Sequence, residues 1–188
     1  MSYILLISEN KLKESTAIQG NVDVDFLLPY VRVAQRKYVE TKLGTQLFNQ
    51  ISDMIKDGTI GDVGNADYKL LLDDYIADML VHWAFYECIP FLRYKIQNGN
   101  IYSKTSENGV ALDRADAQDL REEVRNTAEF YTERLITYIC NNNTKYPKYS
   151  TNTGADVNPD DNAFYAGMNL EKANCCKSNY ITLKDFLN

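Results

Sequence analysis

Apolar residues recur every three or four positions in four stretches of the chain, and each stretch predicts an amphipathic helix. The first helix is expected to begin near Pro29, because proline is tolerated best in the first turn of a helix. It should end at Leu43, with Gly44 as a left-handed cap. The second helix is expected from about Thr45 to Asp57.

The third and fourth helices are longer. The third runs from Tyr68 to Pro90, and its second half is apolar nearly all round, which is typical of a helix at the centre of a bundle. A short continuation through Arg93 and Lys95 is expected beyond it. The fourth helix runs from Asp113 to about Asn141. Its apolar stripe consists of Ala117, Leu120, Val124, Ala128, Tyr131, Leu135 and Tyr138.

Two short β elements accompany the helices. The β-branched and aromatic run from Ser2 to Ser8 predicts an edge strand. The segments Ile101–Lys104 and Val110–Leu112 flank Asn108-Gly109, a turn signal that predicts a β-hairpin over residues 101–112.

The character of the chain changes after Asn141, where asparagine, proline and glycine interrupt every periodicity. The sequence therefore predicts a mainly α fold: a bundle of about four helices over residues 1–141, and an extended C-terminal arm over residues 142–188. The arm carries aromatic residues that a solvated linker would seldom contain. It is expected to lie against its own domain, or else against a neighbouring subunit or partner.

Composition and charge narrow the function. Apolar residues make up 45% of the chain and tyrosines number 14, which indicates a folded protein with half-buried surfaces. The net charge of -6 argues against a dedicated nucleic-acid binder, which needs clustered lysine and arginine. Acidic residues concentrate in the middle of the chain. They form either solvated helix faces or a wall that repels DNA.

No apolar run approaches the roughly 20 residues of a membrane span, and the apolar start from Tyr3 to Ile7 is shorter than that of a signal peptide. We therefore expect a protein made and kept in a cytoplasm, with no membrane partner. The four cysteines have no CxxC spacing. They suggest neither a zinc site nor a disulfide framework, so reduced thiols are expected.

The chain offers little for catalysis. His82 lies beside Trp83 on an apolar helix, where a core histidine is a simpler interpretation than a catalytic base. The glycine-containing run Gly58–Gly64 lacks the Lys-Ser/Thr pair of a phosphate-binding loop. A possible set of oxygen ligands for magnesium or calcium, Asp73, Asp74 and Asp78, is more simply a solvated helix face. The prediction is no enzyme, no metal and no cofactor.

Positive charge gathers in one place, on the first helix, at Arg32, Arg36, Lys37 and Lys42. Arg32 and Arg36 are four residues apart and share a helix face. This face can be simply solvated, can form salt bridges between subunits, or can contact DNA, the last being disfavoured by the overall acidity.

Three stretches in order resemble a known family. They are Thr16–Asp23 (TAIQGNVD), Pro29–Gln35 (PYVRVAQ) continuing to Lys42–Phe48 (KLGTQLF), and Glu107–Val110 (ENGV). The sequence is similar to the head-tail connector, or adaptor, proteins of tailed bacteriophages, especially those of Bacteroidetes hosts and crAss-like phages. The likeness spans roughly residues 1–141.

The resemblance implies a structural virion protein whose copies, commonly twelve, form a ring at the phage neck. Its partners would be other copies, the portal protein, and the next tail or ring protein, with genomic DNA passing through the lumen without sequence-specific binding. It would reside in the virion neck, and in the host cytoplasm during assembly. The hairpin and the arm would reach these partners. The candidate interface residues are Arg32, Arg36, Ile101, Tyr102, Val110, Tyr146, Tyr149, Phe164, Tyr165, Tyr180 and Phe186.

Two alternatives remain. One is a bacterial helical adaptor or regulatory module that binds a peptide or protein in a groove. The other is an enzyme with an unfamiliar carboxylate site.

Overall fold

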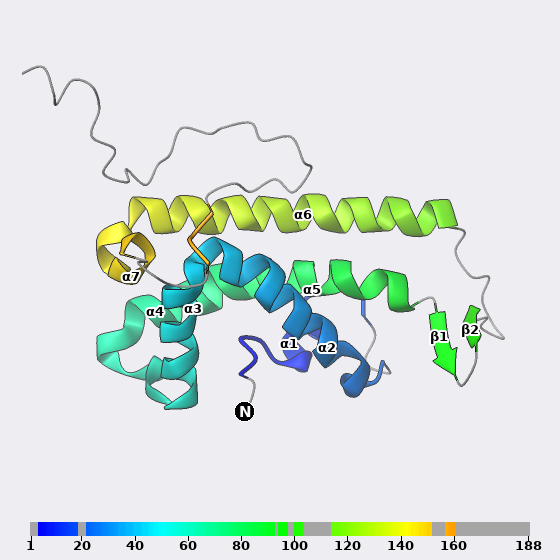
Figure 1. Ribbon diagram of the computed structural model, residues 1–188, viewed down its shortest axis with the longest axis horizontal. Coiled ribbons are helices and arrows are strands. Elements are labelled where there is room, and N and C mark those ends of the chain that lie inside the picture. The colour runs from blue at the N-terminus through cyan, green and yellow to red at the C-terminus, as the bar shows by residue number, and fades with distance from the viewer. Residues whose placement is uncertain are drawn as a thin grey trace, which may run out of the picture.

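The computed structural model describes residues 4–18, 22–92, 94–97, 100–103, 114–151 and 157–160, and this part of the chain is mainly α (Figure 1). The α-helices are α1 (Glu9–Glu14), α2 (Val24–Ala34), α3 (Glu40–Lys56), α4 (Ala66–Leu71), α5 (Ala77–Leu92), α6 (Arg114–Asn141) and α7 (Pro147–Ser150). Two π-helical segments continue the helices, η1 (Gln35–Val39) between α2 and α3, and η4 (Leu72–Ile76) between α4 and α5. Short 3-10 turns are η2 (Thr59–Gly61), η3 (Val63–Asn65) and η5 (Asn143–Lys145).

Helix α2 begins earlier than the sequence predicts. Its N-cap is Asp23, whose carboxylate accepts a hydrogen bond from the Asp25 N–H at 3.1 Å. Pro29 therefore lies inside the helix rather than in its first turn. The side-chain cap fixes the start because it satisfies an amide that the helix leaves without a partner.

The break expected at Gly44 is present. Gly44 has φ 73° and ψ 154° inside α3, so the helical path is interrupted there and resumes over Thr45 to Lys56. The positive φ confirms the prediction, but ψ lies outside the left-handed helical region. This combination of angles is almost exclusive to glycine.

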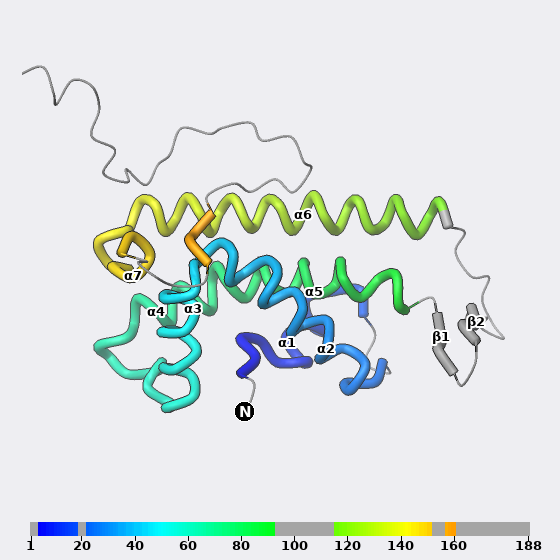
Figure 2. The backbone as a smooth tube through the Cα atoms, in the orientation of Figure 1, coloured from blue at the N-terminus to red at the C-terminus, as the bar shows by residue number. Residues whose placement is uncertain are grey.

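Helix α5 is the centre of the bundle, as its uniform apolarity predicts. It runs antiparallel to α6, and α2 crosses it on another side (Figures 1 and 2). The Trp83 ring stacks on Tyr38 with 3.8 Å between ring centroids, and its Nε1 donates to Thr132 Oγ1 at 2.9 Å. One buried indole therefore links α5 to both η1 and α6.

The β elements differ from the prediction. Strand β1 (Tyr94–Gln97) pairs antiparallel with β2 (Asn100–Ser103), so the expected helical continuation through Arg93 and Lys95 is wrong. The dipeptide between the strands, Asn98-Gly99, is itself a strong two-residue hairpin signal. The pairing expected around Asn108-Gly109 is not the one found for β2, and Val110–Leu112 lies outside the described residues.

The predicted N-terminal strand is also wrong for the described residues 4–8, which form no strand. The side chain of Gln35 makes the hydrogen bonds to the backbone of this segment that a neighbouring strand would otherwise make. Its Oε1 accepts from the Leu6 N–H, and its Nε2 donates to the Ile4 carbonyl, both at 3.0 Å. Gln35 is 4% exposed, so this amide clamp holds the segment against the core.

Within the described residues, no helix is long and apolar enough to cross a membrane.

Candidate interaction surfaces

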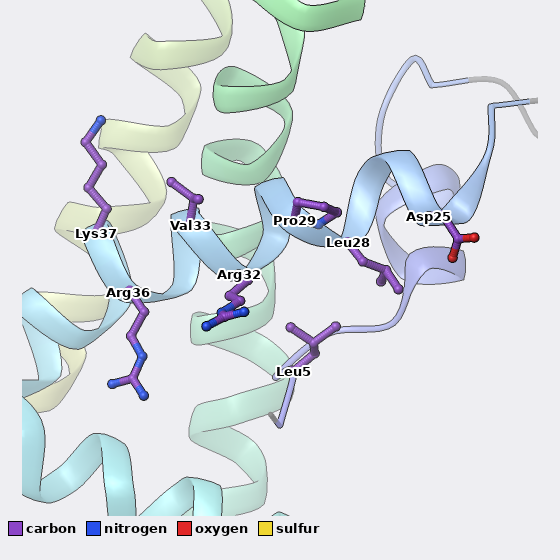
Figure 3. A pocket seen from close by; sticks show the side chains of 8 residues that line it. All are labelled: Leu5, Asp25, Leu28, Pro29, Arg32, Val33, Arg36 and Lys37. Carbon is purple, nitrogen blue, oxygen red and sulfur yellow. The ribbon is translucent and has the colours of Figure 1, made fainter. Parts of the chain in front are cut away.

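A groove of about 870 Å³ lies along the outer side of α2 (Figure 3). It follows from the helical pattern, because Leu27, Val31 and Ala34 face the core and leave the opposite side of α2 outward. The N-terminal segment supplies one further wall, held in place by the Gln35 clamp. The lining residues are Leu5, Asp25, Leu28, Pro29, Arg32, Val33, Arg36 and Lys37.

The groove combines apolar surface with positive charge. Val33 is 46% exposed, and beside it lie the cations Arg32, Arg36 and Lys37, against the single acid Asp25. Surface apolar residues rimmed by polar ones are typical of interaction sites. The structure thus brings Arg32 and Arg36 together, as their spacing predicts, and adds an apolar wall that the sequence pattern did not predict. The sequence did contain one sign of this apolar wall, because Val33 is an apolar residue among the polar positions of this face.

Two cations of the groove are held by acidic neighbours. Arg36 Nη1 is 2.8 Å from Glu40 Oε2, and its guanidinium lies over the Phe48 ring. Lys37 Nζ is 2.7 Å from Glu87 Oε1.

The acceptor Glu87 is fixed in its charged form. Burial raises the pKa of this carboxyl group, but hydrogen bonds from Lys37 and Tyr38 outweigh it, so the pKa lies below its ordinary value. These ion pairs orient the cations at the mouth of the groove.

A second surface is the outer face of α6. Leu120 is 41% and Phe130 63% exposed, although Leu120 was expected in the buried stripe. The stripe is otherwise confirmed at Val124, Ala128 and Leu135, which are buried. Beside Phe130 is a hollow of about 450 Å³, also lined by Tyr75 and Glu133 among others.

His82 faces this helix rather than the groove. Its ring stacks on Tyr131 with 5.0 Å between centroids. Burial lowers the pKa of the His82 imidazole, while Asp78 works against that shift. The His82 side chain is thus half-buried and stacked rather than fully buried in the core.

A third feature is the segment 157–160, here called the strap, which lies across the helix break at Gly44. The Thr45 N–H donates to the Val157 carbonyl at 3.0 Å, and the Asp160 N–H donates to the Thr41 carbonyl at 2.9 Å. A break in a helix leaves such backbone groups without helical partners. The strap satisfies them, so the part of the arm nearest its start lies on the chain's own domain.

Side chains reinforce the strap. Lys42 Nζ is 2.6 Å from Asp160 Oδ2, and the Lys42 side chain is 1% exposed. Pro159 packs so closely that a Cβ on Gly44 would lie 2.8 Å from its Cδ and Cγ atoms.

Tyr146 and Tyr149, two candidate interface residues, belong to the core instead. They are 0% and 5% exposed, and the Tyr146 Oη donates to the Asp67 carbonyl at 3.0 Å. Burial raises the pKa of Tyr146. Neither side chain offers surface to a partner in this structure, so their expected role at an interface is corrected.

Of the other candidates, Ile101 and Tyr102 lie in β2, whose backbone alone is described. The remaining ones, Val110, Phe164, Tyr165, Tyr180 and Phe186, lie outside the described residues.

Groups that could hold a metal do not gather in the described part of the chain, where no three His, Cys, Asp or Glu side chains form a cluster. Asp73 pairs with Lys69, and Asp78 lies 3.6 Å from Arg134.

Cys88 is buried, which raises the pKa of its thiol to about 11. Cys140 is disulfide-bonded, so the expectation of reduced thiols is wrong at this position. Residue spacing along the chain carries no signal for a pairing set by proximity in space.

Comparison with known proteins gives one match. Residues 39–159 match DUF6712, which is described as a family of unknown function. No curated protein and no solved structure matches the chain. The matched range includes the break at Gly44 and Pro159 of the strap, together with α5 and α6.

Proposed function

Because the chain belongs to the DUF6712 family, whose function is unknown, we propose a function from its own sequence and surfaces. The chain is a non-enzymatic structural protein whose copies form a ring at the neck of a tailed phage particle. The ring joins the portal to the tail and lets DNA pass.

The observation that carries this proposal is where the connector-like stretch lies in the fold. The stretch Pro29–Gln35, which contributes to the resemblance, supplies Pro29, Arg32 and Val33 to the exposed groove. If the stretch served folding alone, its outward positions would be expected to be polar. Apolar and cationic side chains side by side favour contact with another protein.

The architecture suits a ring subunit. Contacts between unlike faces close into a ring only if the rotation from one subunit to the next is fixed, which requires a rigid body. Helices α2 and α6 pack on different sides of α5 and are joined through Trp83, Tyr38 and Thr132. These buried contacts hold the two outer surfaces at one relative angle.

In finer detail, we propose a bundle of about four helices with two reaching elements. One is the hairpin formed by β1 and β2, and the other is the C-terminal arm. The strap holds residues 157–160 of the arm on the domain, because it is bonded to both sides of the helix break. We propose that the remainder of the arm binds the portal or the next ring.

Charge supports passage of DNA rather than binding of DNA. The net charge is -6, and acidic residues concentrate in the middle of the chain. A lumen lined with negative charge repels phosphates, and DNA then slides without being held.

Native mass spectrometry of the purified chain, alone and with the portal protein of the same phage, tests the proposal. A connector subunit forms closed rings, or binds the portal as a ring. A regulatory module would use the same groove for a peptide and would ignore the portal. Failure to assemble under either condition would contradict the proposal.

A second experiment addresses the enzymatic alternative. Asp74→Asn and His82→Asn variants should assemble like the wild-type chain. Loss of a measured activity with the fold retained, as judged by circular dichroism, would overturn a purely structural function.

A further inference from the structure

We propose that the α2 groove of one copy receives the outer face of α6 from the next copy, with Phe130 as the apolar anchor. This inference rests on the proposed ring and identifies the surfaces that build it. The partner at the groove is therefore a second copy of this chain.

The apolar parts of the two surfaces correspond. On α6, Leu120, Glu123, Thr127 and Phe130 follow one another at intervals of three, four and three residues, which makes a seam along one side of the helix. Leu120 and Phe130 are the exposed apolar members of this seam. Large aromatic side chains that fill a partner's hollow dominate binding at many interfaces. The groove, with Val33, Leu28 and Leu5 in its walls, offers such a hollow.

The two surfaces also correspond in length. The α6 seam from Leu120 to Phe130 extends about 15 Å at the helical rise of about 1.5 Å per residue. Along α2, the groove from Leu28 to Lys37 extends about 14 Å by the same rise. A helix can therefore lie along the whole groove.

The charges are opposite. The groove lining contains three cations and one acid. Arg36 and Lys37 pair with Glu40 and Glu87, but the side chains of these two cations are 49% and 56% exposed, whereas those of the two acids are only 9% and 14% exposed. The cations therefore remain at the surface that a partner would meet. Around the α6 seam, the exposed acids Asp116, Asp119, Glu122 and Glu123 make no ion pair within the described part of the chain.

Three arginines of α6 do not neutralise these acids, because they contact other residues of the chain. Arg121 lies over the Tyr86 ring, and Arg125 pairs with Glu129 at 2.9 Å. Arg134 lies over the Tyr75 ring. The face that α6 presents to a partner is therefore acidic and apolar.

This distribution of charge favours contact between unlike faces, the groove of one copy and the α6 face of another. Two α6 faces would oppose like charges, as would two grooves, and like-charge pairs disfavour such arrangements. Groove against α6 brings opposite charges together. A contact between unlike faces leaves a groove free on one copy and an α6 face free on the other, so further copies can add until the ring closes.

Cross-linking between two variants tests the contact. Val33→Cys places a thiol in the groove, and Thr127→Cys places one on the seam without removing Phe130. The two variants are mixed under the conditions in which the wild-type chain assembles and are treated with a short bismaleimide. We expect a product of twice the 21.5 kDa chain mass, roughly tenfold above control, because assembly holds the thiols at a high effective concentration.

Two controls set the background. Val63→Cys, at a position 96% exposed, replaces Val33→Cys in a matched mixture. The wild-type chain treated alone reports the reactivity of the native cysteines. Adding Phe130→Ala to the Thr127→Cys copy should lower the product toward this background.

A charge exchange between copies separates specific contact from general surface effects. Arg32→Glu in the Val33→Cys copy, or Glu123→Lys in the Thr127→Cys copy, should each lower the yield several-fold. The two changes together, one in each copy, should restore it because the signs again match.

The possible outcomes distinguish failure of the proposed contact from failure of the proposed ring function. If the chain assembles but the mixed pair stays at background, or if Thr127→Cys cross-links mainly to itself, the proposed contact is wrong while the ring can stand. If the wild-type chain assembles neither alone nor with the portal, both fail.

Discussion

Lys42 and Asp160 are 118 residues apart in the chain and form an ion pair with 2.6 Å between Nζ and Oδ2. The Lys42 side chain is 1% exposed, whereas that of Asp160 is 54% exposed. A buried ammonium is costly without an anion nearby. The stability of the break at Gly44 thus depends on a segment that follows the last long helix.

Asp160→Asn should lower the free energy of unfolding by about 1–2 kcal/mol. This is less than the about 3–5 kcal/mol of fully buried pairs, because solvent screens the half-exposed carboxylate. Urea denaturation followed by circular dichroism measures the change. The matched control is Asp73→Asn, which removes the acid of an ion pair exposed on both sides and should leave the midpoint unchanged. Equal effects at the two positions would show that the strap does not stabilise Lys42.

Gly44→Ala should destabilise the protein through two effects. Backbone strain at φ 73° and ψ 154° costs about 1–3 kcal/mol, and the close approach of Pro159 adds about 1–3 kcal/mol. Gly58→Ala is the control, since Gly58 also has a positive φ but open space around it, and should cost only about 1–2 kcal/mol.

A double variant isolates the contact between the glycine and the strap. Pro159→Ala in the Gly44→Ala background should recover part of the loss, because the Cδ and Cγ atoms that meet the new Cβ are removed. Strict additivity of the two changes in urea denaturation would contradict a direct contact.

Thr132→Val should cost about 1–3 kcal/mol, because it removes the hydroxyl that accepts a hydrogen bond from the buried indole N–H of Trp83 while hardly changing the side-chain volume. Thr127→Val is the matched control on the same helix, where the hydroxyl bonds only to the exposed Glu123 carbonyl, and its effect should stay within about 0.5 kcal/mol. Thermal unfolding of both variants makes the comparison. A neutral Thr132→Val would show that the hydroxyl does not satisfy the indole.

The wild-type chain should lose more stability than a His82→Gln variant when the pH falls below about 6.5. Burial lowers the pKa of folded His82 below its unfolded value of 6.5, so the unfolded chain binds the proton first as the pH falls. The stabilisation is complete above that pH and is lost toward the folded pKa. Urea midpoints at several pH values measure the slope for both proteins.

Asp78→Asn should make that pH dependence steeper, because it removes a charge that favours protonation of folded His82. Identical slopes for all three proteins would contradict a perturbed histidine.

Local pattern was enough to predict much of the fold. The central position of α5 follows from its apolar surface on all sides, and the break at Gly44 follows from a glycine between two amphipathic stretches. These features depend on neighbours within a few residues. The sequence pattern alone is therefore sufficient to predict both features.

Contacts between distant residues could not be predicted in this way. The Gln35 clamp replaces the expected N-terminal strand, and nothing in the spacing of residues 4–8 signals a side-chain partner 29 or 31 positions away. Tyr146 lies beyond the last long helix, yet it is fully buried against the α4 region. The strap likewise meets the break at Gly44 only in the folded chain.

Of the candidate site, the sequence predicted the basic pair Arg32 and Arg36, because their spacing sets them on one helix face. It did not predict the apolar wall, since Leu5 reaches the groove only through the Gln35 clamp. The exposure of Phe130 was also missed. A single apolar residue outside a stripe carries little signal by itself.

Electron microscopy of phage particles made with and without this chain tests whether the chain forms the neck ring. We expect a ring of density between portal and tail that is present with the chain and missing without it, with heads that fail to join tails. Complete particles with an unchanged neck in the absence of the chain would contradict it.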